Sequence, residues 1–197
     1  MAKVIGITGG VGAGKSTVLE ILEKDYHAQI IEADEMAHLL MEPGQACYKE
    51  IIDTFGDEIV GEDKKFNKKA VADLIFKNKE NQETMNHIVH PAVKAKIQKM
   101  IQESSHELII VEAALLIEAG FRDICDEFWY VYVSTQERVK RLYEKRGYSE
   151  VKSYSMIQNQ LSHAQFLKNC EQVVDNSGTI EDTRKEIARI MKGEITS

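Results

Sequence analysis

One stretch, Val4 to Glu20, constrains this chain more than any other part of its sequence. Its central run reads Gly9-Gly10-Val11-Gly12-Ala13-Gly14-Lys15-Ser16-Thr17. The first and sixth residues of that run, with the Lys-Ser pair that follows, satisfy the pattern G-x-x-x-x-G-K-[ST]. An apolar, β-prone run precedes the glycines and an amphipathic helical pattern follows them. The stretch therefore predicts a buried strand, a glycine turn and the start of a helix.

A loop of this kind binds the phosphates of a nucleoside triphosphate. Glycines allow the backbone to curl so that successive N–H groups point inward at phosphate oxygens. The first turn of the following helix adds free N–H donors and the positive end of its dipole. Lys15 is expected to reach the β- and γ-phosphates, and the Ser16 hydroxyl to bind Mg²⁺. The plain alternative is a glycine turn that only joins a strand to a helix.

Composition excludes several other classes of protein. The chain has 197 residues, enough for a sizeable core, and a formal net charge of −7, which argues against a nucleic-acid partner. Its three cysteines are widely spaced and suggest neither a disulfide framework nor a zinc site. No apolar run reaches the length of a membrane span and no secretion signal is evident, so we expect a cytoplasmic location. Nothing in the sequence indicates an oligomeric state.

Short apolar runs alternate with longer amphipathic ones, which predicts an α/β protein with a parallel sheet between helices. Five strands are expected, at 3–8, 29–32, 108–112, 128–133 and 172–175. Between the second and third strands there are only helical patterns, at 35–41, 46–55, 69–76, 80–89 and 92–102, with Pro91 expected to open the last helix.

That long helical stretch predicts an insertion over 34–106 that binds the second substrate. The nucleotide-binding core is then made of 1–33, 107–116, 128–135 and 170–197. The remaining segments, 117–127 and 136–169, are expected to form a helical lid region.

Two carboxylates follow predicted strands, where ligands bind in open parallel sheets. Asp34 could accept a proton from a hydroxyl nucleophile and is our candidate for the catalytic base, although it could also be a helix N-cap. Glu112 could hold Mg²⁺ opposite Ser16, directly or through water, and its plain alternative is a capping or solvated residue.

A basic helix is expected after the fourth strand, with its cations at Arg138, Arg141, Lys145 and Arg146. Arg141 and Lys145 are four residues apart and share a helix face, which could stabilise a transferring phosphoryl group. The alternative is a solvated helix in which Glu137 pairs with Arg141.

Several further motifs occur in order along the chain: Ala33-Asp34, His90-Pro91, Leu115-Leu116-Ile117-Glu118 and Val174-Asp175-Asn176-Ser177-Gly178. With the glycine loop, this set resembles the dephospho-CoA kinase family from residue 3 to about 180. The resemblance implies a P-loop kinase core, a helical insertion that binds the CoA substrate, and a lid. It also implies Mg²⁺-dependent transfer of the ATP γ-phosphoryl group to the ribose 3′-hydroxyl of dephospho-CoA, the last step of coenzyme A synthesis.

The resemblance also implies roles for individual residues. Asp34 takes the catalytic aspartate position, Arg141 a basic position of the lid, and Asn176 a place near the adenine of ATP. His90 falls in the His-Pro motif of the insertion, where the residues alone favour a structural histidine at a helix end, and Leu115 is assigned to the substrate site. The family usually has Asp-Ile-Pro where this chain has Glu112-Ala113-Ala114, and its second lid arginine aligns with Lys145, followed here by Arg146.

Two other functions remain open from the residues. A different P-loop kinase, for nucleosides or nucleotides, would share the core and differ in the insertion. A regulatory NTPase is disfavoured because the Asn-Lys pair at Asn78-Lys79 lies in a polar turn, and Asp53-Thr54-Phe55-Gly56 ends a helix rather than a strand.

Overall fold

The computed structural model describes residues 2–193, apart from the side chains of residues 76 and 77. The chain divides into two compact units. One unit contains the residues up to Ile31 together with those from Ser105 onward, and the other contains Glu32–Ser104. The predicted insertion, 34–106, differs from this second unit by two residues at each end. Among the described residues, no helix is both long and apolar enough to cross a membrane.

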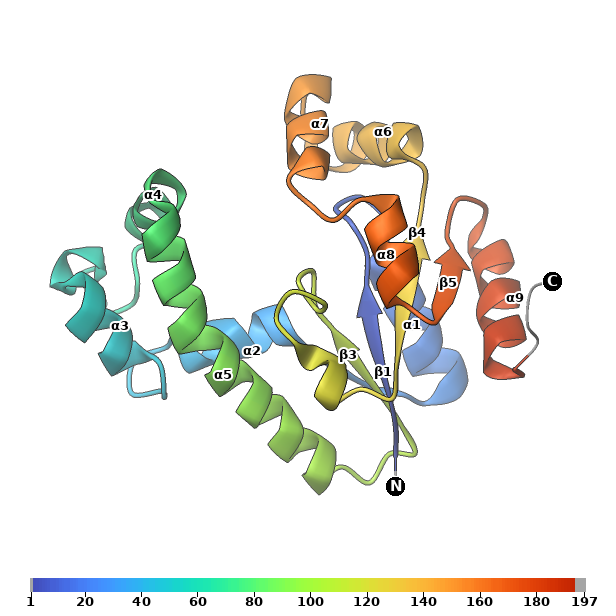
Figure 1. Ribbon diagram of the computed structural model, residues 1–197, viewed down its shortest axis with the longest axis horizontal. Coiled ribbons are helices and arrows are strands. Elements are labelled where there is room, and N and C mark those ends of the chain that lie inside the picture. Colours follow the sequence, from blue (N-terminus) through green and yellow to red (C-terminus); the bar gives the residue numbers. More distant parts are fainter. Residues whose placement is uncertain (1, 194–197) are drawn as a thin grey trace. The chain divides into compact units, whose positions relative to one another are not determined.

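A five-stranded sheet forms the centre of the first unit, in the order β2-β3-β1-β4-β5 (Figure 1). Its strands are β1 (Lys3–Thr8), β2 (Gln29–Glu32), β3 (Leu108–Glu112), β4 (Glu127–Tyr132) and β5 (Gln172–Asp175). The pairings of β1 with β3, of β1 with β4 and of β4 with β5 are parallel. All five residues of β3 are buried, as expected for a strand covered on both faces. The predicted α/β fold with a five-stranded parallel sheet is confirmed.

The fourth strand was predicted one residue too late. It begins at Glu127, which lies opposite Ile5 of β1 and pairs with Lys3 at 2.9 Å. The apolar pattern begins only at Phe128, so the polar first residue of the strand could not be recognised from hydrophobicity.

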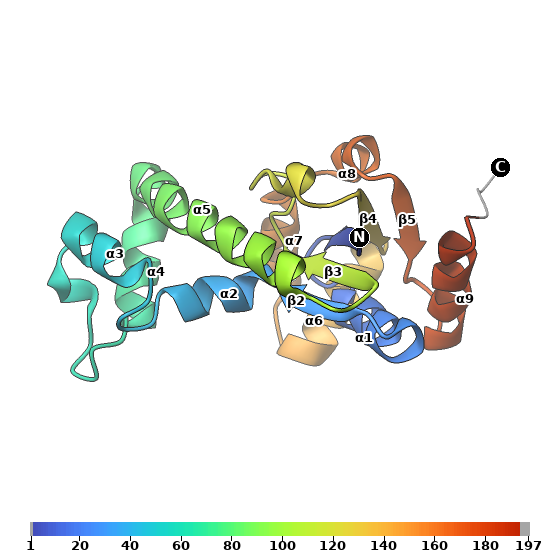
Figure 2. The ribbon, with the colours of Figure 1, turned by 90° about the horizontal axis from the view of Figure 1, so that it is seen from below.

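Helices lie on both faces of the sheet. They are α1 (Lys15–Tyr26), α6 (Thr135–Arg146), α7 (Glu150–Gln158), α8 (His163–Asn169) and α9 (Ile180–Met191), with a short 3₁₀ turn, η2 (Phe121–Asp123). Of these helices, α6 and α7 lie beyond the carboxyl end of β4 (Figure 1). Figure 2 shows α1 and α9 on one side of the sheet and α8 on the other. The core between the sheet and the helices α1 and α9 includes Ile7, Val18, Leu22, Trp129 and Ile187, all of which are fully buried.

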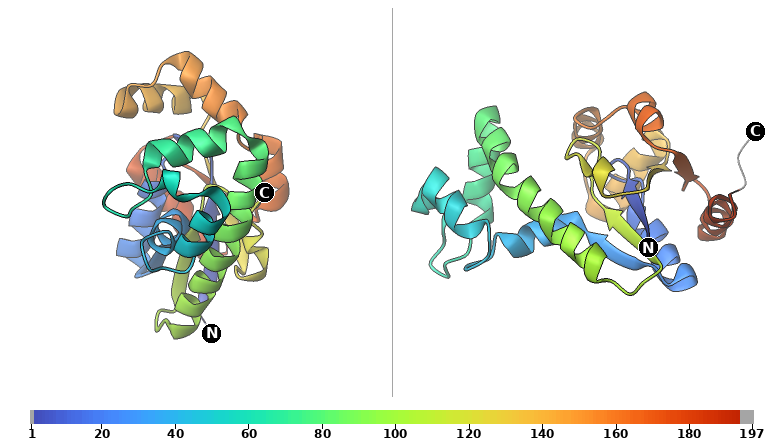
Figure 3. Two further views of the ribbon diagram at one scale, coloured as in Figure 1. Left: turned by 90° about the vertical axis from the view of Figure 1, so that its left-hand side faces the viewer. Right: turned by 60° about the horizontal axis from the view of Figure 1, so that its bottom comes forward.

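The second unit is helical. It contains α2 (Ala33–Leu40), α3 (Tyr48–Phe55), the 3₁₀ turn η1 (Asp57–Ile59), α4 (Lys68–Lys77) and α5 (Lys79–Glu103). The three shorter α-helices, α2, α3 and α4, all contact α5, which is the long green helix of Figure 3.

The prediction that Pro91 opens a new helix is wrong. One continuous helix, α5, runs from Lys79 to Glu103 with Pro91 inside it. A proline in a helix interior costs about 3 kcal/mol, because it removes a backbone hydrogen bond and crowds the preceding turn. Met85, Val89, Val93 and Ile97 are buried at spacings of four residues on both sides of the proline. Burying this continuous apolar face offsets the local cost.

Candidate active site

The glycine loop lies between the end of β1 and the start of α1. Gly14 is the N-cap of α1 and has φ 78°, in the left-handed region that favours glycine. No side chain caps this helix, so the N–H groups of its first turn are left for an anion. Position 10 has no room for a larger residue, because a Cβ on Gly10 would lie 2.1 Å from Nη2 of Arg138. The loop therefore has the backbone that phosphate binding requires.

The side chain of Lys15 bridges the loop and the end of β3. Its Nζ donates a hydrogen bond to the carbonyl oxygen of Gly9 at 3.0 Å and lies 3.3 Å from Oε1 of Glu112. Glu112 is buried, with 7% of its surface exposed, so the alternative of a solvated residue is wrong. The structure thus brings together the lysine predicted to bind phosphate and the carboxylate predicted to bind Mg²⁺.

Two side chains near Lys15 carry oxygen atoms that could bind a magnesium ion. Ser16 is exposed at the second position of α1, and Glu112 ends β3. Among residues 2–193 no group of three or more His, Cys, Asp or Glu side chains could hold a metal. Mg²⁺ bound with a nucleotide takes only one or two ligands from the protein and the rest from phosphate and water. Ser16 and Glu112 fit that kind of site.

Asn176 contacts the other end of the loop, and Arg141 contacts Asn176. The Asn176 amide donates to the carbonyl of Ala13 at 2.8 Å, and its Oδ1 accepts from the Thr183 hydroxyl at 2.8 Å. Arg141 donates from Nη2 to the carbonyl of Asn176 at 2.9 Å. The alternative pair between Arg141 and Glu137 is also present, at 3.2 Å. Both predicted residues therefore lie beside the loop.

Arg138 makes a contact that the sequence analysis did not predict. Its Nε donates to the carbonyl of Val11 at 2.7 Å, and its Nη2 donates to Oε1 of Gln160 at 2.9 Å. The same Gln160 oxygen accepts the N–H of Val11 at 2.9 Å. Arg138 is 7% exposed, and burial lowers the pKa of its guanidinium. We call these three residues the loop clamp, because they tie the tip of the phosphate loop to α6 and to the segment after α7.

Three other candidates of the first unit lie on its surface. Lys145 and Arg146 are exposed in the last turn of α6, and the C-cap residue of this helix is Gly147, with φ 63°. Leu115 follows β3 and is 45% exposed. These positions leave the three side chains accessible to a ligand.

Asp34 and His90 lie in the second unit. Asp34 is exposed at the second position of α2, and Glu32 is the N-cap residue of that helix, so the alternative of Asp34 as an N-cap is wrong. His90 is half-buried in the middle of α5, which corrects its interpretation as a histidine at a helix end. Burial and the neighbouring His87 lower the pKa of His90, so its imidazole is neutral near pH 7.

A sequence model of the family "Dephospho-CoA kinase" matches residues 3–182, most of the chain. The chain belongs to the dephospho-CoA kinase family. This confirms the family, the kinase activity class and the P-loop fold predicted from the motifs.

Individual relatives agree with the family match. A dephospho-CoA kinase from Carboxydothermus hydrogenoformans is 38% identical over 192 residues, which cover 96% of this chain and 93% of the relative. The crystal structure of TT1252 from Thermus thermophilus has a TM-score of 0.85 at 26% identity and covers 100% of this chain and 99% of its own. The fold is also that of dephospho-CoA kinase from Campylobacter jejuni, with a TM-score of 0.70 at 24% identity and coverage of 99% and 100%.

Proposed function

We propose that this protein transfers the γ-phosphoryl group of ATP to the ribose 3′-hydroxyl of dephospho-CoA and releases coenzyme A and ADP. The observation that carries the proposal is the phosphate loop with Lys15 and Glu112 in contact beside it, in a chain of the dephospho-CoA kinase family. The N–H groups of Gly9 to Thr17 and the ammonium of Lys15 bind the phosphates of ATP. Asn176 supports the loop near the adenine.

Asp34 acts as the general base in this proposal. The 3′-hydroxyl oxygen attacks the γ-phosphorus, its proton passes to the Asp34 carboxylate, and the bond from the γ-phosphorus to the bridging oxygen of ADP breaks. The exposed carboxylate at the start of α2 is free to meet a hydroxyl that a substrate presents. His90 and Leu115 are proposed to contact the acceptor.

The negative charge on the transferred phosphoryl group must be stabilised by cations. Ser16 and Glu112 would hold Mg²⁺, which when bound neutralises phosphate charge. Arg141, held beside the loop through Asn176, supplies a planar guanidinium for the equatorial oxygens. Lys145 and Arg146 add positive charge from the last turn of α6, and Lys145, as a point charge, cannot form the paired hydrogen bonds of an arginine.

The test is a coupled assay of ADP release with Mg-ATP. Dephospho-CoA, adenosine, AMP and no acceptor are compared in parallel, and coenzyme A is identified as the product by mass spectrometry. We expect ADP release that depends on dephospho-CoA, with one coenzyme A formed for each ADP. A higher rate with adenosine or AMP would indicate a nucleoside or nucleotide kinase, and equal rates in all four arms would refute a kinase and favour a regulatory NTPase.

A further inference from the structure

A cavity of about 460 Å³ lies in the first unit, between the start of α6, the end of α7 and the start of α8. Three of its lining residues, Tyr130, Val133 and Arg138, are buried, whereas others such as Gln158 and His163 are exposed. The cavity therefore reaches from the solvent to the interior of the unit, and its volume is in the range that holds a small molecule. We call it the α6–α8 cavity.

The lining of this cavity holds a cation and, among its described residues, no carboxylate. Arg138 of the loop clamp is its one lysine or arginine, in a chain with a formal net charge of −7. The guanidinium donates to the backbone carbonyl of Val11 and to the side-chain oxygen of Gln160, and no described carboxylate pairs with it. Burial lowers the pKa of Arg138, and a phenol, that of Tyr130, opposes this effect in place of a carboxylate. Dipoles alone thus stabilise the charge.

A buried charge without a counter-ion is unusual. Buried ions are almost always paired, because their removal from water costs several kcal/mol. Nε and Nη2 of Arg138 make the two hydrogen bonds above, and Nη1 makes none with the described residues. Among those residues, the polar side-chain atom that is sealed from solvent without a partner is Oγ of Ser153, so Nη1 is not sealed. Nη1 is therefore a free donor for an anion.

Aromatic rings form another part of the cavity wall. The ring centroids of Tyr132 and His163 are 4.8 Å apart, and those of Tyr130 and Tyr132 are 6.0 Å apart. Tyr130 also stacks on Phe166 at 4.5 Å, which fixes the position of its ring. Rings of this kind pack well against a planar group. One permanent cation balances one negative charge, which favours a carboxylate over a phosphate group with its charge of about −1.5 to −2.

We propose that the α6–α8 cavity binds a small aromatic carboxylate, whose charge pairs with Arg138 and whose ring packs against Tyr132 and His163. This site is additional to the ATP, Mg²⁺ and acceptor sites of the proposed function and does not depend on the identity of the acceptor. Because Arg138 also holds the Val11 carbonyl, the bound anion stabilises the loop clamp. The anion and ATP therefore bind together, and each tightens the binding of the other, since coupling between two sites is reciprocal.

The first test compares benzoate with benzamide, which has nearly the same shape and no charge. The wild-type protein is titrated with each probe, and the backbone amide signals of Ser134 and Leu161, both at the cavity, are followed by NMR. We expect the Kd of benzoate to be about tenfold lower than that of benzamide, the effect of one charge-assisted hydrogen bond. Equal Kd values for the two probes, or no shift of these signals with either, would overturn the proposal.

The second test repeats both titrations with Arg138→Met and with Lys140→Met, at a temperature where both are folded. Each variant loses one positive charge from α6, but Lys140 is exposed and is not a lining residue. The preference for benzoate should disappear in Arg138→Met and stay near tenfold in Lys140→Met. Because the preference is a ratio of two Kd values for one protein, a loss of stability does not imitate this result. A preference that survives in Arg138→Met would contradict the pairing.

A third variant decides if Arg138→Met does not fold. Ile157 is half-buried in the cavity lining at the end of α7, so the larger ring of Ile157→Phe takes space from the ligand. We expect this variant to raise the Kd of both probes about tenfold. Val151→Phe, at an exposed position of the same helix, should bind them as the wild type does. Equal binding by the two variants would exclude the cavity as the site.

The last test separates the cavity from the phosphate loop. Benzoate is titrated with and without saturating ATP, in the absence of an acceptor. We expect ATP to lower the Kd of benzoate about fivefold, at the weak end of typical couplings between sites. A higher Kd in the presence of ATP would show that the nucleotide itself is the counter-ion of Arg138 and would overturn the separate site. An unchanged Kd would refute the coupling through the loop clamp.

Discussion

Replacing Arg138 by methionine tests whether the loop clamp prepares the phosphate loop for ATP. Arg138 is buried on α6 and donates to the Val11 carbonyl at 2.7 Å and to Gln160 at 2.9 Å. Methionine keeps much of the apolar length of arginine but has no donor. In the variant the Val11 carbonyl loses its partner, while Gln160 can still accept the Val11 N–H.

The size of the effect follows from these contacts. A hydrogen bond from a charged donor contributes about 1.5 to 3 kcal/mol, so the two together contribute about 3 to 6 kcal/mol before desolvation is counted. Burial of the guanidinium opposes folding, as the lowered pKa of Arg138 shows. We expect a net loss of about 3 kcal/mol, which in a domain of this size lowers the melting temperature by about 6 to 12 °C.

Loss of stability alone would not establish a role in binding ATP, so the assay has two parts. Thermal melting measures stability, and equilibrium titration at a temperature where the variant is folded measures the Kd for ATP. We expect that Kd to rise about tenfold, because part of the binding energy must then order the loop tip. The KM for dephospho-CoA should change less than twofold.

Lys140→Met is the matched control, since Lys140 is exposed on the same helix and the variant loses the same charge. Arg138→Lys should recover only part of the affinity, because one ammonium cannot reproduce two divergent donors. If Arg138→Met had the melting temperature and the ATP affinity of Lys140→Met, the clamp would have no part in preparing the loop. If it lost stability but kept ATP affinity, its role would be structural only.

Four further predictions concern single side chains. Asp34→Asn should lower turnover by roughly 10²-fold or more while ATP still binds, and a folded variant with near-normal turnover would remove Asp34 from the mechanism. Lys15→Ala should weaken both ATP binding and turnover, and unchanged affinity in a titration would contradict the assignment of the loop. Glu112→Gln should raise the Mg²⁺ concentration needed for half the maximal rate by about tenfold, and an unchanged Mg²⁺ dependence would exclude Glu112 as a ligand. At Glu171 burial raises the pKa, but hydrogen bonds from Arg122 and from the Phe128 N–H outweigh it, so the folded pKa is lowered. The stability that this carboxylate contributes is therefore present above the unfolded pKa of about 4.3 and is lost as the pH falls through the lowered folded pKa. The difference in free energy of unfolding between wild type and Glu171→Gln, measured by urea unfolding, should be largest above pH ~5 and shrink toward pH ~3.

The parts of the fold that follow from local chemistry could be predicted from the sequence. The strand, loop and helix around Gly14 and Lys15 were predictable because glycines in left-handed conformations and an uncapped helix start are properties of a few consecutive residues. The three central strands, β3, β1 and β4, were predictable because strands buried on both faces read as continuous apolar runs. The error of one residue at the start of β4 arose because that strand begins with the polar residue Glu127.

Predictions failed where burial outweighed local preference. Pro91 was expected to begin a helix, yet the buried row from Met85 to Ile97 continues the helix through it. Asp34 was expected at a strand end or a cap, but α2 starts directly after β2, so Asp34 lies in the first helical turn. In both cases the packing of a whole helix face contributes more free energy than the conformational preference of one residue.

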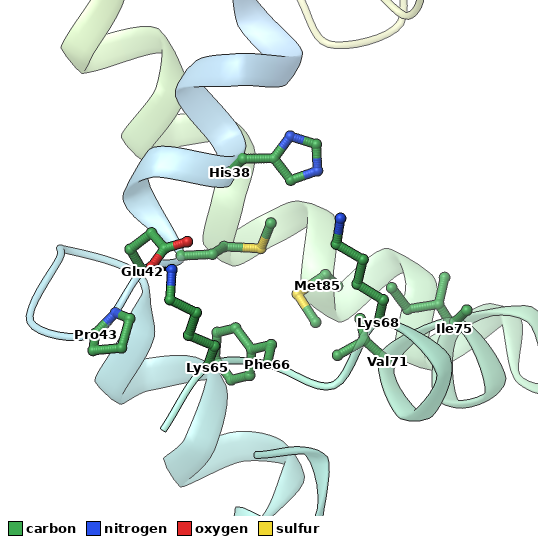
Figure 4. A pocket seen from close by; sticks show the side chains of 11 residues that line it. His38, Glu42, Pro43, Lys65, Phe66, Lys68, Val71, Ile75 and Met85 are labelled. Atoms are coloured by element: carbon green, nitrogen blue, oxygen red, sulfur yellow. Dashed lines mark ion pairs between the residues drawn. The ribbon is translucent and has the colours of Figure 1, made fainter. Parts of the chain in front are cut away.

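The sequence contained enough information to identify a phosphate loop, its lysine and the kinase family, because these depend on residue types at fixed short spacings. It did not reveal the loop clamp, nor the cavity of about 570 Å³ in the helical unit Glu32–Ser104 (Figure 4). Arg138 meets Val11 across 127 positions of the chain, and the cavity lining is drawn from residues as far apart as His38 and Met85. Contacts between residues so distant in sequence exist only once the elements that carry them have packed together.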